Sequence, residues 1–433
     1  MKILVLGSGG REHALVKKLQ KEKNVEKVFF LPGNAGCPPE DLLAGSLEDF
    51  DRIAHIVRQF SIDLVVVGPE KPLAAGIKDY LEQKVKVPVF GPSQSAAQLE
   101  ASKVFAYRFM EKAAIPAAKS QVAKSLEEAK KILENFSLPV VIKVDGLAQG
   151  KGVSIHQDIA SALEKLSDIF EKNIFGDAGR QVLISEFLRG REASLFAICN
   201  GREGIFLPVA QDYKRAFDGD EGPNTGGMGS YVPAKHLSEK HIAYAHEKIL
   251  KPVLEEFHYT GVLYIGLMVH GREAHELSVI EFNCRLGDPE AQCILASLAG
   301  ELLPYLLWSC GMIEVVPKLQ RDGYFAVPTQ NLAVVNVVLA ARGYPDNPVK
   351  GIPISLPSKP VPNIDIIHAG TTYQNGQIIS SGGRILNILA TANNLVTARA
   401  LAYDFIEKKL SCYLDFQQLH YRKDIGLDHA SPC

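Results

Sequence analysis

Short apolar runs alternate with amphipathic helical patterns through the first ninety residues of the chain. Strands are predicted at KILVLG, VEKVFF, DLVVV and VPVF, with helices between them at REHALVKKLQK, DFDRIAHIVRQF and PLAAGIKDYLEQ. Strands that alternate with helices form βαβ units and a parallel sheet. Such sheets bind ligands outside the carboxyl ends of their strands, where the turns GSGGRE, PGNAG and GPE fall. The sequence therefore predicts an α/β protein with a ligand site on these turns.

Two further sets of strands follow along the chain. From about 115 to 325, longer strands such as VVIKVDG, QVLISEFL, GVLYIGLMV and LSVIEFN are interleaved with helices and glycine-rich loops. From about 326 to 425, the runs NLAVVNVVLAA, IDIIHAG and GRILNILATA predict another group of strands. At 433 residues the chain is long enough for several cores. We therefore expect three domains.

Charge and cysteine usage exclude several classes of protein. The 47 basic and 49 acidic residues nearly cancel, so we expect no nucleic-acid or membrane-surface partner. The seven cysteines are scattered and never spaced C-x-x-C, which is typical of a reducing compartment. No apolar run reaches about 18 residues, and MKILVLGSGG runs straight into a strand without a signal peptide. These features predict a cytoplasmic protein.

The turn GSGGRE suggests nucleotide binding, but it departs from the dinucleotide fingerprint. That fingerprint needs a third glycine for close helix packing, and Glu12 stands there instead. The second strand also ends in Leu-Pro-Gly, with no acidic residue to hold a ribose hydroxyl. An NAD-dependent oxidoreductase is therefore disfavoured. A helix N-terminus able to hold one phosphate remains possible, as does a purely structural tight turn.

The segment DGLAQGKGV, residues 145–153, resembles a P-loop but fails two of its requirements. Gly146 and Gly150 enclose three residues instead of four, and Gly152 replaces the Ser or Thr that binds magnesium. Its glycines and Lys151 can still wrap phosphates, so the metal ligands must come from elsewhere. Just upstream, Lys143 lies in an apolar run, where a buried ammonium needs an anion such as phosphate. The alternative is a strand-edge lysine that reaches solvent.

The strand in VIEFNCRLGDPEAQ, residues 279–292, carries a second cluster of polar groups. Side chains alternate along a strand, so Glu281, Asn283 and Arg285 are predicted to share one face, while the other face (Ile280, Phe282, Cys284) packs inward. Two oxygen ligands two residues apart suit a magnesium ion that also takes phosphate oxygens. An arginine beside them could hold a transferring phosphoryl group. The alternative is a half-exposed strand whose charges face water.

The segment QDYKRAFDGDEGPNTGGMGSY, residues 211–231, is rich in charge and glycine and poor in apolar residues. It is either a flexible loop or a substrate clamp. In the clamp, Asp212, Lys214 and Arg215 would act together with the backbone of NTGGMG. Closely spaced glycines allow the backbone to approach a small ligand.

Ten motifs now stand in a fixed order: LGSGGREHAL, PGNAG, VGPE, FGPS, GLAQGKGV, DYKRAFDGDEGPNTGGMG, EFNCRLGDPE, HAGT, GGRIL and YRKDIG. Nearly end to end, the chain closely resembles the phosphoribosylamine–glycine ligase (glycinamide ribonucleotide synthetase) family of ATP-grasp enzymes. The resemblance implies an N-terminal parallel-sheet (Rossmann-like) domain over 1–104 and a central ATP-grasp domain over 105–325. It also implies a mobile lid over about 120–190 and a small C-terminal α+β domain over 326–433.

The family joins glycine to 5-phosphoribosylamine with ATP and Mg²⁺ or Mn²⁺ through a glycyl phosphate, in purine synthesis, and the resemblance implies a monomer with these small-molecule partners. It implies ATP contacts from Lys103, Lys143, Gly146, Gly150, Lys151, Gly152, Val153, Glu186, Phe187, Leu188 and Glu192. It implies Glu281 and Asn283 as metal ligands, and Arg285, Lys151 and Lys143 as catalytic cations. The implied substrate contacts are Gly10, Arg11, Glu12, Asn34, Pro69, Glu70, Asp212, Lys214, Asn224, Thr225, Gly226, Gly227, Met228 and Arg285.

Three departures from the family pattern stand outside these ligands. Ser185 replaces the first glutamate of a Glu-Glu-Phe hinge near adenine, Ala101 replaces a glycine, and PDNPVKGIPISLP replaces a glycine-rich stretch. Another ATP-grasp carboxylate–amine ligase, acting on a different acid or amine, is the alternative within the same fold. A catalytically dead ATP-binding module is disfavoured, because the predicted cations and metal ligands are all present.

Overall fold

The computed structural model describes residues 1–147 and 152–427. Its N-terminal part is a four-stranded parallel sheet in the order β2-β1-β3-β4. The strands are β1 (Lys2–Gly7), β2 (Lys27–Pro32), β3 (Leu64–Val67) and β4 (Val89–Phe90). The helices that alternate with them are α1 (Gly10–Leu19), α2 (Phe50–Phe60), α3 (Glu70–Ala74) and α4 (Ile77–Val85). The predicted parallel α/β unit is confirmed.

This sheet is buried on both faces, as all-parallel sheets are. Ile3 and Val5 of β1 pack into one hydrophobic cluster, whereas Leu4 and Leu6 pack into another on the opposite face. Apart from Lys2 and Lys27, which begin β1 and β2, the strands therefore consist of continuous apolar runs, and the polar residues at their carboxyl ends lie in the turns. That confinement brings the turns GSGGRE, PGNAG and GPE to one edge.

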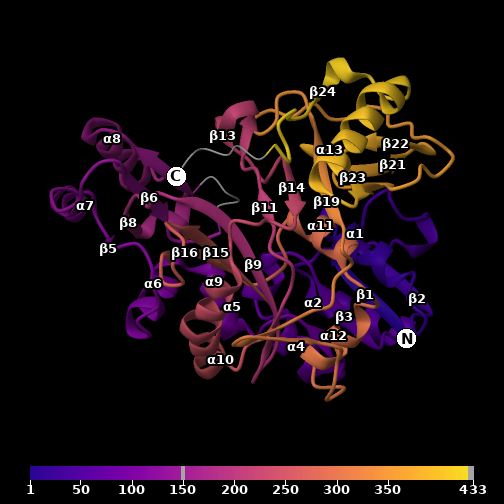
Figure 1. Cartoon of the computed structure of the whole chain (residues 1–433), viewed down its shortest axis with the longest axis horizontal. Coiled ribbons are helices and arrows are strands. Elements are labelled where there is room, and N and C mark those ends of the chain that lie inside the picture. Colours follow the sequence, from indigo (N-terminus) through magenta and orange to yellow (C-terminus); the bar gives the residue numbers. More distant parts are fainter. Residues whose placement is uncertain (148–151, 428–433) are drawn as a thin grey trace.

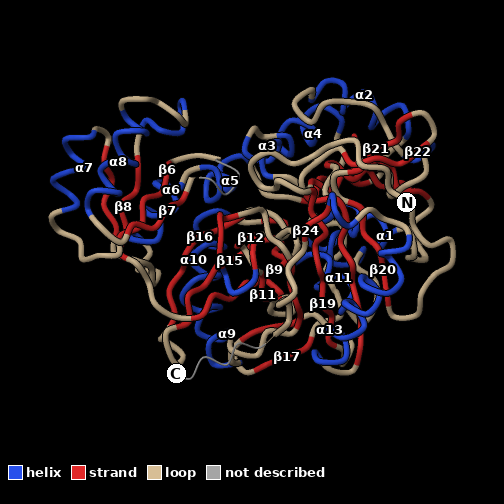
Figure 2. The backbone as a smooth tube through the Cα atoms, turned by 90° about the horizontal axis from the view of Figure 1, so that it is seen from above, coloured by secondary structure: helices blue, strands red, loops and turns tan. Residues whose placement is uncertain are grey.

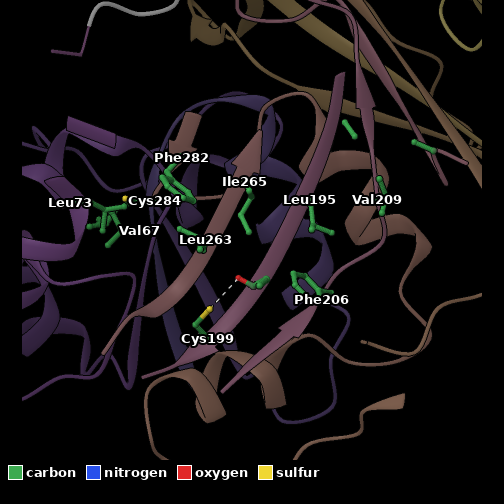
Figure 3. Packing of buried hydrophobic residues seen from close by; sticks show 14 of the residues in the cluster. Val67, Leu73, Leu195, Cys199, Phe206, Val209, Leu263, Ile265, Phe282 and Cys284 are labelled. Atoms are coloured by element: carbon green, nitrogen blue, oxygen red, sulfur yellow. Dashed lines mark hydrogen bonds between the residues drawn. The ribbon is translucent and has the colours of Figure 1, made fainter. Parts of the chain in front are cut away.

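The central sheet has six strands in the order β16-β15-β9-β10-β18-β17. They are β9 (Arg191–Asn200), β10 (Gly204–Phe206), β15 (Thr260–Val269), β16 (Leu277–Asn283), β17 (Leu319–Arg321) and β18 (Tyr324–Ala326). The helices of this region are α5 (Gln94–Ala101), α6 (Lys103–Lys112), α9 (Glu239–Ala245), α10 (Lys251–Phe257), α11 (Glu290–Ser297) and α12 (Leu303–Ser309). Figure 3 shows side chains of β9, β15 and β16, among them Leu195, Ile265 and Phe282, packed in the core beside this sheet.

Strand β16 contains a β-bulge at the position where the sequence predicted strict alternation. Gly266 of β15 pairs with Glu281 and Leu267 pairs with Val279, so Ile280 is an extra residue. The bulge shifts the inward-facing set from Leu277 and Val279 to Phe282 and Cys284. The prediction that Ile280 packs inward is therefore wrong, since Ile280 is half-buried and lies outside the core clusters.

A separate four-stranded antiparallel sheet has the order β5-β8-β6-β7. Its strands are β5 (Ser120–Ala123), β6 (Val140–Val144), β7 (Val153–His156) and β8 (Val182–Glu186), and its helices are α7 (Leu126–Leu133) and α8 (Ile159–Phe170). This unit has its own hydrophobic cluster. Figures 1 and 2 both place it at one end of the molecule, far from the C-terminal strands.

The C-terminal sheet joins strands from distant parts of the chain in the order β11-β14-β19-β23-β20. Its strands are β11 (Gln211–Asp212), β14 (Gly229–Val232), β19 (Ala333–Ala341), β20 (Ile364–His368) and β23 (Arg384–Ala392), with β24 (Leu419–His420) beside β19. Two hairpins, β12 (Arg215–Phe217) with β13 (Glu221–Asn224) and β21 (Thr371–Gln374) with β22 (Gln377–Ser380), accompany helix α13 (Leu395–Asp404). The predicted clamp segment is thus built into the C-terminal sheet.

Helix α1 packs against strand β20 through a buried pair of histidines. The backbone N–H of His368 donates to Nδ1 of His13 at 2.8 Å, and the two rings meet edge-on. Burial lowers the pKa of both rings, that of His368 to about 4. Lys17 of α1 and Asp365 of β20 form an ion pair beside them. The N-terminal and C-terminal sheets are therefore joined by specific polar contacts.

Among the described residues, no helix has the length and apolar composition needed to cross a membrane.

Candidate active site

The bulged end of β16 holds the predicted metal ligands beside a lysine from the separate four-stranded sheet. Nδ2 of Asn283 lies 3.4 Å from Oε1 of Glu281. Lys143 of β6 donates from Nζ to the carbonyl oxygen of the bulged residue Ile280 at 3.0 Å. Burial lowers the pKa of Lys143, while the charge of Glu281 opposes that shift. Glu281 thus supplies part of the negative charge that was predicted near Lys143.

The charge of Glu281 is stabilised by three lysines. Burial would raise the pKa of its carboxyl, but Lys214, Lys103 and Lys143 outweigh burial and lower it. Nδ2 of Asn283 faces Glu281, while its Oδ1 faces Arg285. A carboxylate oxygen and an amide oxygen from these two residues are ligands that Mg²⁺ accepts when phosphate and water complete its shell. Within residues 1–147 and 152–427 no group of three or more His, Cys, Asp or Glu side chains could hold a metal. This pair fits a metal that also takes phosphate oxygens.

Gly146, in the described first part of the predicted phosphate loop, lies next to Lys103, the first residue of α6. Nζ of Lys103 donates to the carbonyl oxygen of Gly146 at 3.0 Å. Gly146 has φ of 153°, which glycine adopts readily. Gly152 lies just before β7, and Val153 opens that strand. Gly150 and Lys151, two further predicted ATP contacts, lie outside the described residues.

The predicted adenine segment, Glu186 to Leu188, begins at the end of β8. Oε1 of Glu186 accepts the backbone N–H of Lys119 at 2.8 Å. The preceding Ser185 points the other way, since its side chain is buried and bonds to Ser120 at 2.7 Å. Phe187 and Leu188 follow β8 as an irregular link to β9. At Ser185, where the sequence departs from the family pattern, the side chain therefore makes a hydrogen bond in the interior of the protein.

Glu192, Asp212 and Lys214 form a charged cluster over strands β9 and β11. Nζ of Lys214 lies 2.7 Å from Oε2 of Glu192 and 4.0 Å from Oδ2 of Asp212. Burial would lower the pKa of Lys214, but Asp212 and Glu192 raise it well above its usual value. Burial raises the pKa of Asp212 even though Lys214 opposes it. The cluster therefore joins the largely buried carboxylate of Asp212 to two charged side chains, Lys214 and Glu192, that are 37% and 42% exposed.

The predicted clamp loop closes on the same cluster. Both the backbone N–H and Oγ1 of Thr225 donate to the carbonyl oxygen of Lys214 at 2.8 Å. Gly227 has φ of 110°, and a Cβ there would lie 2.3 Å from Cδ of Pro289. Asn224 ends β13, and the side chain of Met228 is fully buried. The structure thus brings the loop, Asp212 and Lys214 together.

Arg285 joins this region to the N-terminal sheet. Its guanidinium lies 2.7 Å from Glu100 and 3.5 Å from Glu70, and it donates to Oδ1 of Asn283 at 3.2 Å. Burial would lower the pKa of Arg285, but the two glutamates raise it. Glu100 was missed from the sequence, because a lone glutamate in helix α5 carries no signal of a site. The ion pair with Glu100 therefore holds the guanidinium of Arg285 where it also donates a hydrogen bond to Asn283.

The N-terminal turn residues are packed into the protein. Arg11 forms an ion pair with Glu12 and donates to the carbonyl oxygen of Leu286 at 2.9 Å. Glu12 accepts the backbone N–H of Gly9 at 2.7 Å, and a Cβ at Gly7 or Gly68 would come within 2.4 Å of its side chain. The glycines of GSGG and VGPE thus make room for a buried carboxylate.

Three other predicted substrate residues lie around the same turns. Asn34 is buried and donates from Nδ2 to the carbonyl oxygens of Ser8 at 2.9 Å and His368 at 3.1 Å. Pro69 precedes α3, and Glu70 opens it. Gly10 begins α1, directly against Gln292 and Asn387. Of these residues, Glu70 makes the link to Arg285.

Arg384 of β23 reaches the clamp loop from the C-terminal sheet, and sequence reasoning assigned it no role. Its NH1 donates to the carbonyl oxygens of Gly226 at 2.6 Å and Asp288 at 2.7 Å, and its NH2 lies 3.1 Å from Oδ2 of Asp288. The hydroxyl of Tyr344 accepts the backbone N–H of Gly226 at 2.9 Å. The motif GGRIL was the available signal, but its spacing indicated no partner.

Comparisons with known proteins show the family to which the chain belongs. The family models described as phosphoribosylglycinamide synthetase N domain, ATP-grasp (A) domain and C domain match residues 1–100, 101–291 and 334–428. The chain is 43% identical to the phosphoribosylamine–glycine ligase of Leptospira interrogans (serovar Lai), over 98% of both sequences. It is 40% identical to that of Listeria innocua, over 98% of this chain and 99% of the relative.

Two solved structures have the same fold. The crystal structure of phosphoribosylamine–glycine ligase from Thermotoga maritima matches with a TM-score of 0.78 and 35% identity, over 98% of this chain and all of that one. The biotin carboxylase domain of the 2-oxoglutarate carboxylase of Hydrogenobacter thermophilus matches with a TM-score of 0.73 over 97% of this chain and 91% of that one. At 15% identity the second match shows the fold alone.

Proposed function

Because the chain belongs to the phosphoribosylglycinamide synthetase family and has phosphoribosylamine–glycine ligase activity in purine biosynthesis, we propose how its residues perform that ATP-dependent reaction. Carboxylates are poor electrophiles, so ATP first phosphorylates glycine to glycyl phosphate. The amine of phosphoribosylamine then attacks the acyl carbon, and phosphate leaves as the amide forms. The protein contributes positioning and charge stabilisation.

Lys103, Lys143 and the loop at Gly146 to Val153 hold the ATP phosphates in this proposal. Its support is the contact of Lys103 with Gly146 and of Lys143 with Ile280 in β16. Glu281 and Asn283 hold the divalent metal, Mg²⁺ or Mn²⁺. When bound, the metal neutralises phosphate charge. Glu192 and the segment Glu186 to Leu188 face the nucleoside.

Arg285 and Lys214 serve the glycine carboxylate and the phosphoryl group that it receives. Both cations lie within a network of glutamates and aspartates, which raises the pKa of each and keeps it charged. The loop from Asn224 to Met228 covers glycine, and the N-terminal turns with Arg11 and Glu70 receive phosphoribosylamine. The single observation that carries this assignment is Arg285, which contacts Glu70 on the amine side and Asn283 on the metal side.

We also propose that the chain divides after residues 104 and 325, and that residues 120–190 close over ATP as a lid. The separate sheet and hydrophobic cluster of β5 to β8 support a lid that moves as one body. Closure matters chemically, because glycyl phosphate hydrolyses if water reaches it.

The test is release of ADP in the presence of ATP and magnesium, with phosphoribosylamine generated in situ from ribose 5-phosphate and ammonia. Each component is then omitted in turn. Release that requires both glycine and the amine, with the amide product seen by mass spectrometry, is the expected result. ADP release that persists without glycine would overturn the proposed chemistry. Release with other acids or amines instead would point to a different ligase of the same fold.

A further inference from the structure

Most carboxylates of the candidate site already have a cation close by. Glu70 and Glu100 share Arg285, Glu192 contacts Lys214, and Asp288 contacts Arg384. Glu281 lies beside Asn283, and the charges of Lys214, Lys103 and Lys143 together lower the pKa of its carboxyl. These groups are balanced before any amino acid binds.

Glu290 is the exception within the described part of the chain. It is the first residue of α11, its residue is only 3% exposed, and no cationic side chain lies within 4.0 Å of its carboxylate there. Its one side-chain hydrogen bond comes from Oγ of Ser194, at 3.3 Å to Oε1. The charge of Asp212 acts on Glu290 and is itself only partly balanced, since its Oδ2 lies 4.0 Å from Lys214. Buried carboxylates in this situation call for a cationic partner.

The surroundings of Glu290 locate that partner in the substrate site. A Cβ at Gly287 would lie 2.4 Å from Oε2 of Glu290, so the glycine leaves room for the carboxylate at this position. Burial, with the charge of Asp212, raises the pKa of Glu290 to about 7, and Lys214 and Arg285 oppose that shift. Glu290 therefore lies among the charges of Asp212, Lys214 and Arg285.

Glycine at neutral pH is a zwitterion, so its site must supply charges of both signs within a few ångströms. Arg285 and Lys214 supply the positive charges for the carboxylate end. We propose that Glu290, with Asp212 beside it, receives the α-ammonium group of glycine. This inference rests on the proposed function, since it assigns the other end of the same substrate. An ammonium placed there completes the charge balance that the free protein lacks.

The pairing explains why an amino acid, and not a simple carboxylic acid, is selected. Acetate has the carboxylate of glycine but no ammonium group, so it leaves Glu290 buried and unpaired. Because an analogue without the ammonium group leaves a buried carboxylate unpaired, the site should discriminate strongly against that analogue. Glu290 is in this sense a specificity residue, and it need not take part in phosphoryl transfer.

The substitution Glu290→Gln tests the proposal by removing the charge while keeping the shape. We expect the KM for glycine to rise about 10- to 100-fold, while the KM for ATP changes less than about twofold. Acetate, measured as a competitive inhibitor against glycine, should keep its Ki within about twofold in the same variant. If glycine and acetate weaken together, or if the KM for glycine stays within about twofold, the proposal is overturned.

Glu22→Gln is the matched control. Glu22 is also a buried glutamate, but it accepts the backbone N–H groups of Leu302 and Leu303. This control should leave the KM for glycine unchanged even where it lowers the melting temperature.

A second variant covers the case in which Glu290→Gln does not fold. Glu290→Asp keeps the negative charge but shortens the side chain by one methylene, which moves the carboxylate away from the ammonium group of glycine. The KM for glycine should therefore rise, while the Ki of acetate should stay unchanged. An unchanged KM for glycine in this variant would also overturn the proposal. Failure of the proposed function is distinguishable, because the wild-type protein would then show no glycine-dependent ADP release.

Discussion

Replacing Arg285 by lysine keeps the positive charge but removes the planar fork, and this tests whether orientation matters at the centre of the site. Lysine has a single Nζ, which can keep the ion pair with Glu100 (2.7 Å) but then loses the bond to Oδ1 of Asn283 (3.2 Å). The bond to the carbonyl oxygen of Leu286 is also lost, but that oxygen still accepts from Arg11 at 2.9 Å.

The loss is therefore one hydrogen bond from a charged donor, worth about 1.5–3 kcal/mol, together with the longer contact of 3.5 Å between Nε and Glu70. If that bond orients Asn283 in the transition state, kcat/KM should fall about 10- to 150-fold. The half-saturating magnesium concentration should rise as well, because Asn283 is a proposed metal ligand. Steady-state ADP release over a magnesium series measures both quantities.

The control for this prediction is Arg321→Lys, since Arg321 lies at the surface and its nearest acidic partner, Glu239, is 3.9 Å away. That variant should match the wild type in rate and in magnesium dependence. A fall of less than threefold for Arg285→Lys, with unchanged magnesium dependence and an unchanged melting temperature, would refute the orienting role. Arg285 would then act only as a charge.

Three further predictions follow from the same structure. Glu281→Ala should lower kcat by more than about 100-fold with little change in the thermal unfolding midpoint, and equal loss of both would count against its role as a metal ligand. Gly10→Ala should destabilise the protein by about 1–3 kcal/mol in urea unfolding, because the new Cβ would lie 2.6 Å from Nδ2 of Asn387; an unchanged urea midpoint would contradict this. Burial lowers the pKa of the His368 ring from 6.5 to about 4. The contribution of neutral His368 to the free energy of unfolding should therefore be fully present above pH 6.5, and it should fall by up to about 3 kcal/mol as the pH drops from 6.5 to about 4. His368→Gln should flatten this dependence of the melting temperature, whereas exposed His55→Gln should leave it as in the wild type.

The sequence predicted the N-terminal sheet well because its signal is local. Each strand there is a continuous apolar run bounded by turn residues, so period and composition agree. The same local logic placed Glu281 and Asn283 side by side, since residues two apart in a strand share a face. The β-bulge at Ile280 was not predictable, because it depends on the pairing of β16 with Gly266 and Leu267 of β15.

Partners that lie far apart in the sequence could not be predicted. Glu100 and Arg285 meet only because helix α5 packs beside β16. Arg384 reaches the carbonyl oxygen of Gly226 across 158 positions of the chain, and no spacing rule links the two. The role proposed for Glu290 likewise depends on the finding that no cationic side chain of the described residues lies within 4.0 Å of its carboxylate. That absence becomes visible only once every neighbouring charge has been placed.

The C-terminal sheet, with its shared strands, limits how this protein can be modified by evolution or in the laboratory. Strands β11 and β14 precede residue 233, yet β14 pairs along its length with β19, which begins at Ala333. Cutting the chain between them would leave β14 with an open edge, and open edges promote aggregation. The C-terminal region is therefore no detachable module. Exchange of whole domains between relatives should succeed only when β11, β14 and the loop between them travel with the C-terminal strands.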